Sequence, residues 1–260
     1  MSRLVAILGQ AWAAIWLTFA LCGVVHATDL RDGGPLTLVI TYHVAPANRA
    51  AFRQELEQPV STQLRRWRDN GVLQSYRVVY NRYVDSSNWD AMALITFGKD
   101  SDVGRWKKIE QEFPAGLSPK ALSLTNSIDT VPADLIRQNG APAMTEASVL
   151  LVIPYELSVP VDEYVAYLDS YVLPQTDGWM KEGVLARYGV YLPRYPAGRP
   201  WQSLLVLEYK SDQALGAREA AVAKVRARLK SNPTWKAISD SKKSVRIEKS
   251  PVIADTVAAD

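Results

Sequence analysis

Apolar and polar residues alternate along the chain near residue 40 and predict a strand there. Within residues 36–44, Leu, Leu, Ile, Tyr and Val occupy one face, and Thr, Val, Thr and His occupy the other. Apolar positions then recur at helical spacing at Phe52, Leu56 and Val60, and Gly71 ends the predicted helix. This part of the chain is therefore predicted to form a strand followed by a helix.

Two more strands, a second helix and a last strand complete this pattern. Residues 72–83 and 89–97 are predicted strands, and the polar turn 84–88 separates them. Asp102 begins a segment with apolar residues at helical spacing, and residues 122–130 are predicted as the last strand. The element order is strand, helix, strand, strand, helix, strand.

The same pattern occurs a second time. Trp67 is followed by Gly-Val-Leu, Tyr, Val, Arg-Tyr and Trp at fixed spacings, and the identical series follows Trp179, 112 positions later. A match of this many Trp, Tyr and Gly residues at one offset indicates an internal duplication. The pair Ala133-Asp134 recurs as Ala254-Asp255, which predicts that both repeats end alike.

The duplication sets the predicted domain boundaries. The first repeat is predicted at 35–131 and the second at 147–258, with the last strand of the second at 243–249. Residues 132–146 are rich in Pro, Ala and Gly and are predicted as the linker between them. The two repeats account for nearly all of the chain after residue 34.

This element order is the ferredoxin-like βαββαβ pattern, in which one antiparallel sheet carries two helices on a single face. The other face must be covered, and a chain with two repeats can pack its own two sheets together. We therefore predict an α+β fold, in which two ferredoxin-like repeats form an intramolecular pseudo-symmetric α+β barrel. The second repeat then supplies the surface that another chain would provide, so we expect a monomer.

The element order and the Gly-Val-Leu, Tyr, Arg-Tyr and Trp pattern resemble the dimeric α+β barrel superfamily in a fused tandem form. The resemblance is nearest to the NIPSNAP, EthD-like and antibiotic-biosynthesis-monooxygenase-like groups, and it covers residues 35–258. It implies a central barrel whose interior binds a small molecule. Members include cofactor-independent oxygenases, isomerases, cyclases and haem proteins. In the haem-binding members the ligand histidine lies on a helix, whereas His43 lies on a predicted strand, so we expect no cofactor.

The N-terminus has the pattern of a secretory signal. Arg3 gives a positive start, residues 4–25 carry no charge, and Val25-His26-Ala27 resembles a small-residue cleavage site. We predict a signal peptide over 1–27, a periplasmic or secreted location, and no membrane span after cleavage. The alternative is that the apolar run stays as a membrane anchor. Cleavage would leave His43 as the only histidine of the mature chain.

Composition and motifs exclude several classes of protein. The chain has 260 residues, of which 48% are apolar and 22% charged, as in ordinary globular proteins. A net charge of +3 does not indicate a nucleic-acid partner. One cysteine and two histidines leave little material for metal sites or thiol nucleophiles, and phosphate-loop, His-Glu-x-x-His and Gly-x-Ser-x-Gly motifs are absent. We predict no metal site.

Three titratable residues are candidates for acid/base chemistry in the barrel. Strand alternation puts His43 on the barrel side of its strand, Glu156 at the matching position of the second repeat, and Glu208 on a neighbouring strand. A histidine and a carboxylate within hydrogen-bond reach can move a proton to or from a carbon acid. The alternative is that these are strand-end residues near solvent, or a satisfied polar pair.

Four further residues are predicted to line the barrel interior and bind a ligand: Thr41, Arg77, Thr96 and Arg187. We expect an exported protein that binds a small, partly apolar molecule there. Two alternatives stay open. One is a cofactor-independent isomerase, cyclase or oxygenase that uses His43 with a carboxylate. The other is a non-catalytic structural or interaction protein of the envelope, which predicts a filled barrel.

The repeated tryptophans and arginines have two interpretations each. Trp67 with Trp179, and Trp89 with Trp201, could line an aromatic pocket, but their recurrence in both repeats favours core packing. Arg82-Tyr83 and its copy at residues 194–195 are expected to hold an anionic group, or to fix the following turn to a helix C-terminus.

Overall fold

The computed structural model describes residues 34–141, 147–241 and 244–259. The signal peptide predicted over 1–27 lies outside the described residues, as do residues 142–146 of the predicted linker. In the described part of the chain, no helix is long and apolar enough to cross a membrane.

Each repeat contains the predicted order of strands and helices. The first comprises β1 (Leu36–Val44), η1 (Pro46–Asn48), α1 (Arg49–Glu55), η2 (Leu56–Val60), α2 (Ser61–Asp69), β2 (Ser75–Asn81), β3 (Ala91–Phe97), α3 (Asp100–Glu112), η3 (Pro114–Gly116), α4 (Pro119–Leu124) and β4 (Thr125–Gly140). The second comprises β5 (Val149–Leu157), α5 (Val161–Tyr167), η4 (Leu168–Val172), α6 (Leu173–Lys181), β6 (Leu185–Pro193), β7 (Ser203–Tyr209), α7 (Asp212–Gly216), α8 (Arg218–Leu229), α9 (Pro233–Ser241), β8 (Arg246–Glu248) and β9 (Val252–Ala259).

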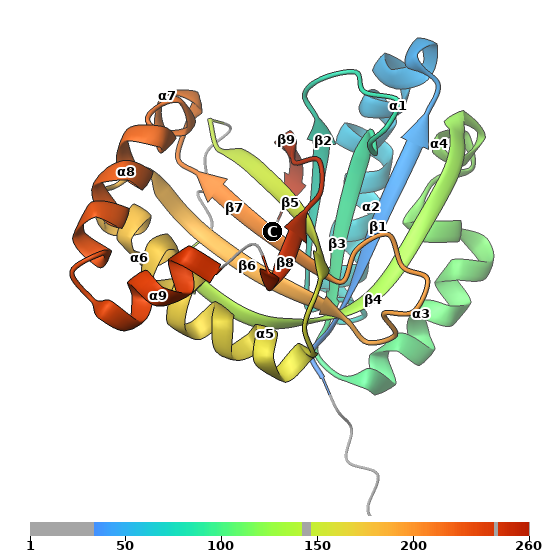
Figure 1. Ribbon diagram of the computed structural model, residues 1–260. Helices are drawn as coiled ribbons and strands as arrows, with labels where there is room; N and C mark the ends of the chain where they lie inside the picture. The colour runs from blue at the N-terminus through green and yellow to red at the C-terminus, as the bar shows by residue number, and fades with distance from the viewer. Residues whose placement is uncertain (1–33, 142–146, 242–243, 260) are drawn as a thin grey trace, which may run out of the picture. The chain divides into compact units, whose positions relative to one another are not determined.

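Eight antiparallel strands close into a barrel (Figure 1), in the order β7-β6-β4-β1-β3-β2-β9-β5, with β5 returning to β7. Strands β4 and β9 join the repeats, because each pairs first with a strand of its own repeat and then with a strand of the other. The predicted fold of two ferredoxin-like repeats in one α+β barrel is confirmed.

The two ends of the barrel carry different parts of the predicted site. Every pairing around the barrel is antiparallel, so β1, β2, β5 and β6 all begin at one end, where β3, β4, β7 and β9 finish. We call this the arginine end, because Arg77 and Arg187 lie near the starts of β2 and β6. The opposite end, where β1 and β5 finish with His43 and Glu156, is called the histidine end.

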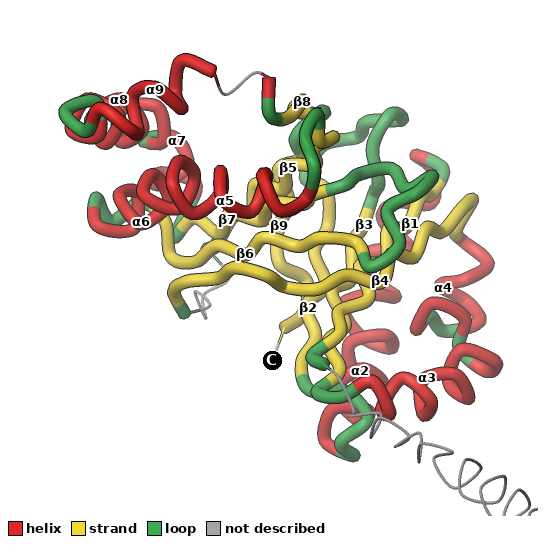
Figure 2. Tube along the Cα trace, turned by 60° about the horizontal axis from the view of Figure 1, so that its bottom comes forward, coloured by secondary structure: helices red, strands yellow, loops and turns green. Residues whose placement is uncertain are grey.

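Helices cover the outside of the barrel in two layers, which Figure 2 shows on opposite flanks of the strands. In the first repeat, Ile40, Tyr42, Ala93 and Ile95 point outward into the core beneath the helices, as the alternation predicts. The alternate positions point inward and fill the middle of the barrel, including Val39 and the residues Met92, Leu94, Val131, Leu150, Val152, Leu204, Val206 and Val252. The interior is therefore an apolar core and not an open channel.

The last strand of each repeat differs from the prediction. Strand β4 runs from Thr125 to Gly140, so the first part of the segment predicted as linker, residues 132–140, is strand. Residues 246–248 of the predicted last strand form the short β8 at the edge of β5, whereas the true counterpart of β4 is β9. Strand β4 extends over the predicted linker because it pairs there with β6 of the other repeat, which the sequence of a single repeat does not encode.

Reciprocal ion pairs join the two repeats. Arg82 of the first repeat binds Asp255, 2.5 Å from guanidinium nitrogen to carboxylate oxygen, and also Asp212 at the start of α7. Arg194 of the second binds Asp134 at 2.8 Å and Asp100, at the start of α3, at 2.9 Å. These arginines hold anionic groups as one interpretation expected, but the groups are aspartates at helix N-termini and on the joining strands. Hydrogen bonds to Asp255 raise the pKa of Arg82.

The recurring tryptophans are confirmed as core residues. Trp67 packs beneath the helices of the first repeat and Trp179 beneath those of the second. Trp89 and Trp201 belong to the barrel interior.

Candidate functional site

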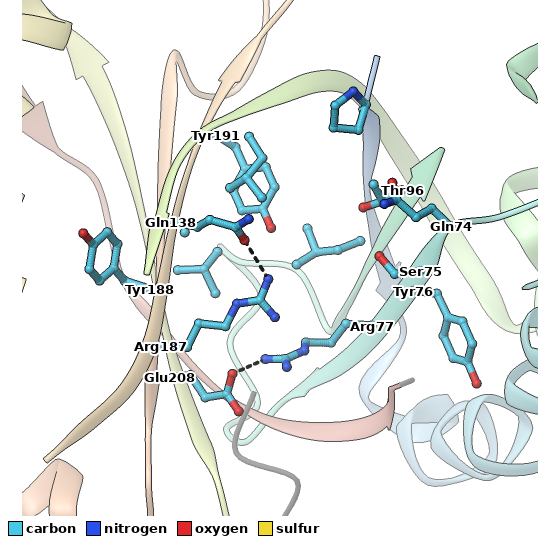
Figure 3. A pocket seen from close by; sticks show the side chains of 15 residues that line it. Gln74, Ser75, Tyr76, Arg77, Thr96, Gln138, Arg187, Tyr188, Tyr191 and Glu208 are labelled. Carbon is cyan, nitrogen blue, oxygen red and sulfur yellow. Dashed lines mark hydrogen bonds and ion pairs between the residues drawn. The ribbon is translucent and has the colours of Figure 1, made fainter. Parts of the chain in front are cut away.

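A pocket of about 230 Å³ opens at the arginine end of the barrel (Figure 3). Strands β2 and β3 of the first repeat supply one wall, and β6 and β7 of the second supply the other. The pocket therefore lies where the two repeats meet, at the end of the apolar core.

A buried ion pair crosses this pocket between the repeats. Nη1 of Arg77 donates to Oε2 of Glu208 at 2.5 Å, and the side chains are only 12% and 2% exposed. Taking both charges out of water costs several kcal/mol per ion in general, which the pairing only partly returns. The pair holds the Arg77 guanidinium in one place on the pocket wall.

A second arginine lies beside this pair. Arg187 is opposite Glu208 in the β6–β7 register, and its Nη2 donates to Oε1 of Gln138 at 3.1 Å. Figure 3 shows the Arg187 guanidinium between Gln138 and the Arg77 side chain. A bulge in β4 shifts its register between Leu135 and Arg137, so both Leu135 and Gln138 line the pocket.

Hydroxyl groups complete the polar lining. Tyr191 is buried, and Figure 3 shows its hydroxyl directed toward the middle of the pocket. Burial raises the pKa of Tyr191, and the charges of Arg187 and Arg77 oppose this increase only in part, so the phenol stays protonated at neutral pH. On the other wall, the hydroxyls of Thr37 and Thr96 share a hydrogen bond of 3.0 Å.

The residues that face the pocket differ between the repeats, although those around them are the same. The register pairs Ser75 with Thr96 and, at the equivalent place, Arg187 with Glu208. The next residue along each strand is a tyrosine in both repeats, Tyr76 after Ser75 and Tyr188 after Arg187. The two tyrosine side chains point away from the pocket toward the helices (Figure 3). The outward positions kept the residues needed for packing, whereas the pocket positions diverged.

The third pocket position that differs between the repeats is occupied by Arg77 in the first repeat and by Gly189 in the second. A Cβ atom at Gly189 would come within 3.2 Å of the Tyr191 ring and 3.3 Å of Leu135. This is closer than ordinary van der Waals contact, so glycine leaves the second wall of the pocket open.

The structure brings four of the predicted site residues together and separates three others. Arg77, Thr96, Arg187 and Glu208 all line the pocket at the arginine end. Thr41, His43 and Glu156 lie toward the histidine end. The prediction had placed all seven in one interior.

The predicted acid/base set is not assembled. Glu208 lies opposite Leu150, six residues before Glu156 on β5, which corresponds to about 20 Å along a strand. Nε2 of the half-buried His43 is 3.8 Å from Asp129, and the exposed Glu156 carboxylate is 3.5 Å from Lys249. These are strand-end polar pairs, as the alternative interpretation proposed.

Gln138, Gly189 and Tyr191 were missed as site residues. The signal for two of them was present, because Arg187, Gly189 and Tyr191 alternate along one strand and so share a face. Gln138 had no such signal, since it depends on the bulge in a segment predicted as linker. In the described residues, no group of three or more His, Cys, Asp or Glu side chains could hold a metal ion.

Comparisons with known proteins give similarity of fold. No protein-family model matches the chain, and no curated protein matches its sequence. The solved structures that match it along most of its length include the following three. An anthrone oxidase-like protein has a TM-score of 0.56 at 15% identity, covering 88% of this chain and 93% of its own.

The other two are monooxygenase-like proteins. That of Fusobacterium nucleatum has a TM-score of 0.55 at 10% identity, covering 87% of this chain and 94% of its own. That of Lactobacillus acidophilus has a TM-score of 0.54 at 10% identity, covering 87% of this chain and 96% of its own. Together with the closed barrel, these likenesses show that the chain has an α+β barrel fold.

Proposed function

We propose that the protein binds a small, partly apolar organic anion in the pocket at the arginine end. The observation that carries this proposal is the charge of the lining, where the described residues comprise two arginines and one glutamate. Because Glu208 pairs with Arg77, the positive charge of Arg187 is left for a ligand. An anionic ligand also accepts hydrogen bonds from the protonated Tyr191 hydroxyl.

The lining also limits the size and character of this ligand. A volume of about 230 Å³ is smaller than the pockets of about 300 Å³ or more that hold drug-sized molecules. Leu94, Leu135 and Val206 give one part of the wall an apolar surface. A short-chain carboxylic acid satisfies both the charge and the apolar wall.

Binding without catalysis is favoured over the enzymatic alternatives. The expected isomerase, cyclase or oxygenase chemistry used His43 with a carboxylate in the barrel interior, but His43 lies at the other end from Glu208, and the carboxylate beside it is the solvent-exposed Asp129. The monooxygenase-like proteins resemble this chain in fold alone, at 10% identity. Within the dimeric α+β barrel superfamily, we place the chain near the NIPSNAP, EthD-like and antibiotic-biosynthesis-monooxygenase-like groups, on its element order and repeated motif.

Location and assembly complete the proposal. The signal-like pattern of residues 1–27 supports export to the periplasm or the medium. The closed barrel formed by two repeats supports a monomer, because both sheets have their partner within one chain.

A thermal-shift panel of small acids tests the proposed function. Isovalerate, hexanoate and succinate should each raise the melting temperature of the purified protein, whereas the matched amides should not, because a neutral amide gains no ion pair with Arg187. Arg187→Gln should abolish the shift. The matched control is Arg65→Gln, an exposed arginine on α2 that does not line the pocket, and this variant should keep the shift. Equal shifts for acids and amides, or for Arg187→Gln and the unaltered protein, would overturn the proposal.

A further inference from the structure

A row of three hydroxyl side chains crosses the sheet on the side of the pocket that the first repeat supplies. Thr37 on β1 lies opposite Thr96 on β3, and Thr96 lies opposite Ser75 on β2. Directly opposite residues of an antiparallel sheet have Cβ atoms about 4.5–5.5 Å apart, so the three side chains lie next to one another on one face. We call them the hydroxyl row. Figure 3 shows Ser75 and Thr96 across the pocket from Arg187 and Gln138.

The equivalent row of the second repeat has a different chemistry. Leu150 on β5 lies opposite Glu208 on β7, and Glu208 lies opposite Arg187 on β6. By the internal duplication, these three residues are the counterparts of the hydroxyl row. Members of both rows line the same pocket. Two walls that arose as copies of one sequence are now neutral on one side and charged on the other, so the pocket suits a molecule whose two ends differ.

The hydroxyl row is only partly satisfied within the chain. Oγ1 of Thr37 and Oγ1 of Thr96 share one hydrogen bond of 3.0 Å. The half-buried Ser75 lines the pocket, and its hydroxyl makes no hydrogen bond with any described residue. A hydroxyl group can both donate and accept. Ser75 and Thr96 together therefore offer a donor and acceptors to a molecule in the pocket.

A second acid group would find no unpaired cation on this wall. Arg77 lies two residues after Ser75, on the same face of β2, but it is bound to Glu208 of the other repeat. The other arginine among the described lining residues is Arg187, which lies on the opposite wall. A neutral group that both donates and accepts hydrogen bonds fits the hydroxyl row, whereas a methyl group would leave Ser75 without a partner.

The charged wall fixes the other end of the molecule. Tyr191 is only 7% exposed, and its hydroxyl is directed toward the middle of the pocket (Figure 3). This hydroxyl makes no hydrogen bond with any described residue, and a buried phenol of this kind calls for a partner. A carboxylate placed beside Arg187 accepts a hydrogen bond from it. The two polar ends of the ligand therefore lie on opposite walls.

We propose that the ligand of this pocket is a short-chain hydroxy acid. Its carboxylate is bound by Arg187 and Tyr191, and its hydroxyl group is bound by Ser75 and Thr96. The apolar part of the lining contacts the carbon chain between them. This inference rests on the proposed function, which it narrows from small organic anions in general to acids that carry a hydroxyl group. Unsubstituted acids bind more weakly, through the carboxylate alone.

Isothermal titration with butyrate and with its 2-, 3- and 4-hydroxy derivatives tests the inference. The four acids have the same charge and chain length and differ only in the hydroxyl group. At least one hydroxybutyrate should bind about 5-fold more tightly than butyrate, which is the size of effect that a hydrogen bond between neutral groups gives. Succinate should bind no more tightly than butyrate, because the hydroxyl row has no cation for its second carboxylate.

Ser75→Ala removes the unpartnered hydroxyl of the row and leaves the hydrogen bond between Thr37 and Thr96 in place. The preference for the best hydroxybutyrate over butyrate should then fall below about 2-fold. The matched control is Ser86→Ala, an exposed serine of the loop between β2 and β3 that does not line the pocket, and this variant should keep the preference. Circular dichroism confirms that both variants are folded.

The inference and the proposed function fail in different ways. If butyrate binds to the unaltered protein but no hydroxybutyrate binds more tightly, or if succinate binds more tightly than all four acids, the inference is wrong and the proposed function stands. A preference that persists in folded Ser75→Ala would also overturn the inference. No binding of any of these acids would overturn both.

Discussion

Arg77 of the first repeat and Glu208 of the second form a buried ion pair across the arginine end of the barrel, 2.5 Å from Nη1 to Oε2. The pair joins β2 to β7, which are not neighbours in the sheet. It is the one place in the described pocket lining where charges from the two repeats meet. The same contact that links the repeats therefore also shapes the candidate binding site.

Breaking this ion pair on one side should be costly. Glu208→Gln leaves the Arg77 guanidinium buried without its counter-charge and should lower the free energy of unfolding by about 3–5 kcal/mol. The double variant Arg77→Met, Glu208→Leu removes both charges and should recover most of that loss. Urea unfolding of Arg77→Met, of Glu208→Leu and of the double variant, each compared with the unaltered protein, measures the coupling energy. Additive effects of the two substitutions would show that the pair does not interact.

Narrowing the pocket at Gly189 should reduce binding more than stability. Gly189→Ala adds a Cβ within 3.2 Å of the Tyr191 ring and 3.3 Å of Leu135, so these two side chains of the pocket lining must move. We expect the thermal shift produced by isovalerate to fall by at least half, with a loss of stability of about 1 kcal/mol or less. Gly216→Ala is the matched control, because a Cβ there meets no atom within 4 Å. If Gly189→Ala bound isovalerate normally, the second wall of the pocket would not contact the ligand.

The two repeats should respond differently to the loss of equivalent residues. Trp106→Ala removes a buried ring that packs on Trp67 and should cost about 3–5 kcal/mol. Arg218→Ala alters the equivalent position of the second repeat, where a cavity already exists, and should cost about 1 kcal/mol or less. Thermal and urea unfolding of both variants measures this difference. Equal losses would mean that Arg218 is as tightly packed as the tryptophan.

The ion pair between Arg137 and Asp169 should make stability sensitive to acid. Arg137 on β4 donates to both oxygens of Asp169, at 2.7 and 2.8 Å, and these hydrogen bonds lower the pKa of Asp169 below its usual value of 3.8. The stabilisation is therefore complete above pH 3.8 and is lost as the pH falls through the lowered pKa. Because Asp169 is half-exposed, the effect is small.

The variant Asp169→Asn tests the expected direction of this pH dependence of stability. The variant should be slightly less stable than the unaltered protein at pH 7, and the difference should shrink as the pH is lowered from about 5 to about 2. Urea midpoints across that range measure it, with Asp162→Asn on the exposed side of α5 as the control. A difference that stays constant with pH would contradict the assignment of the pair.

Much of the barrel could be predicted from the sequence because the alternation of apolar and polar residues and the repeated motif can both be read within short segments. The alternation in residues 36–44 correctly separates Ile40, beneath the helices, from Val39, inside the barrel. The internal duplication correctly predicts the same arrangement of strands for the second repeat. The last strands were misplaced because β4 and β9 owe their length to pairing with the other repeat, and no local pattern records such a partner.

The candidate site was predicted in part, for a physical reason. Alternation gives the face of a strand but not the end of the barrel at which a residue lies. Glu208 is near the end of its strand, and in an antiparallel pair that end lies beside the start of the neighbouring strand. Glu208 could therefore not meet Glu156, which is near the finish of β5. Gln138 depends on a bulge, which has no sequence signature here.

The direct test of ligand binding at the arginine end is isothermal titration of isovalerate into the unaltered protein, Arg187→Gln and Arg65→Gln. We expect saturable binding to the unaltered protein and to Arg65→Gln, and affinity at least 10-fold weaker for Arg187→Gln. Absence of binding to the unaltered protein, or equal affinity for Arg187→Gln, would contradict the proposal that this pocket binds a small organic anion.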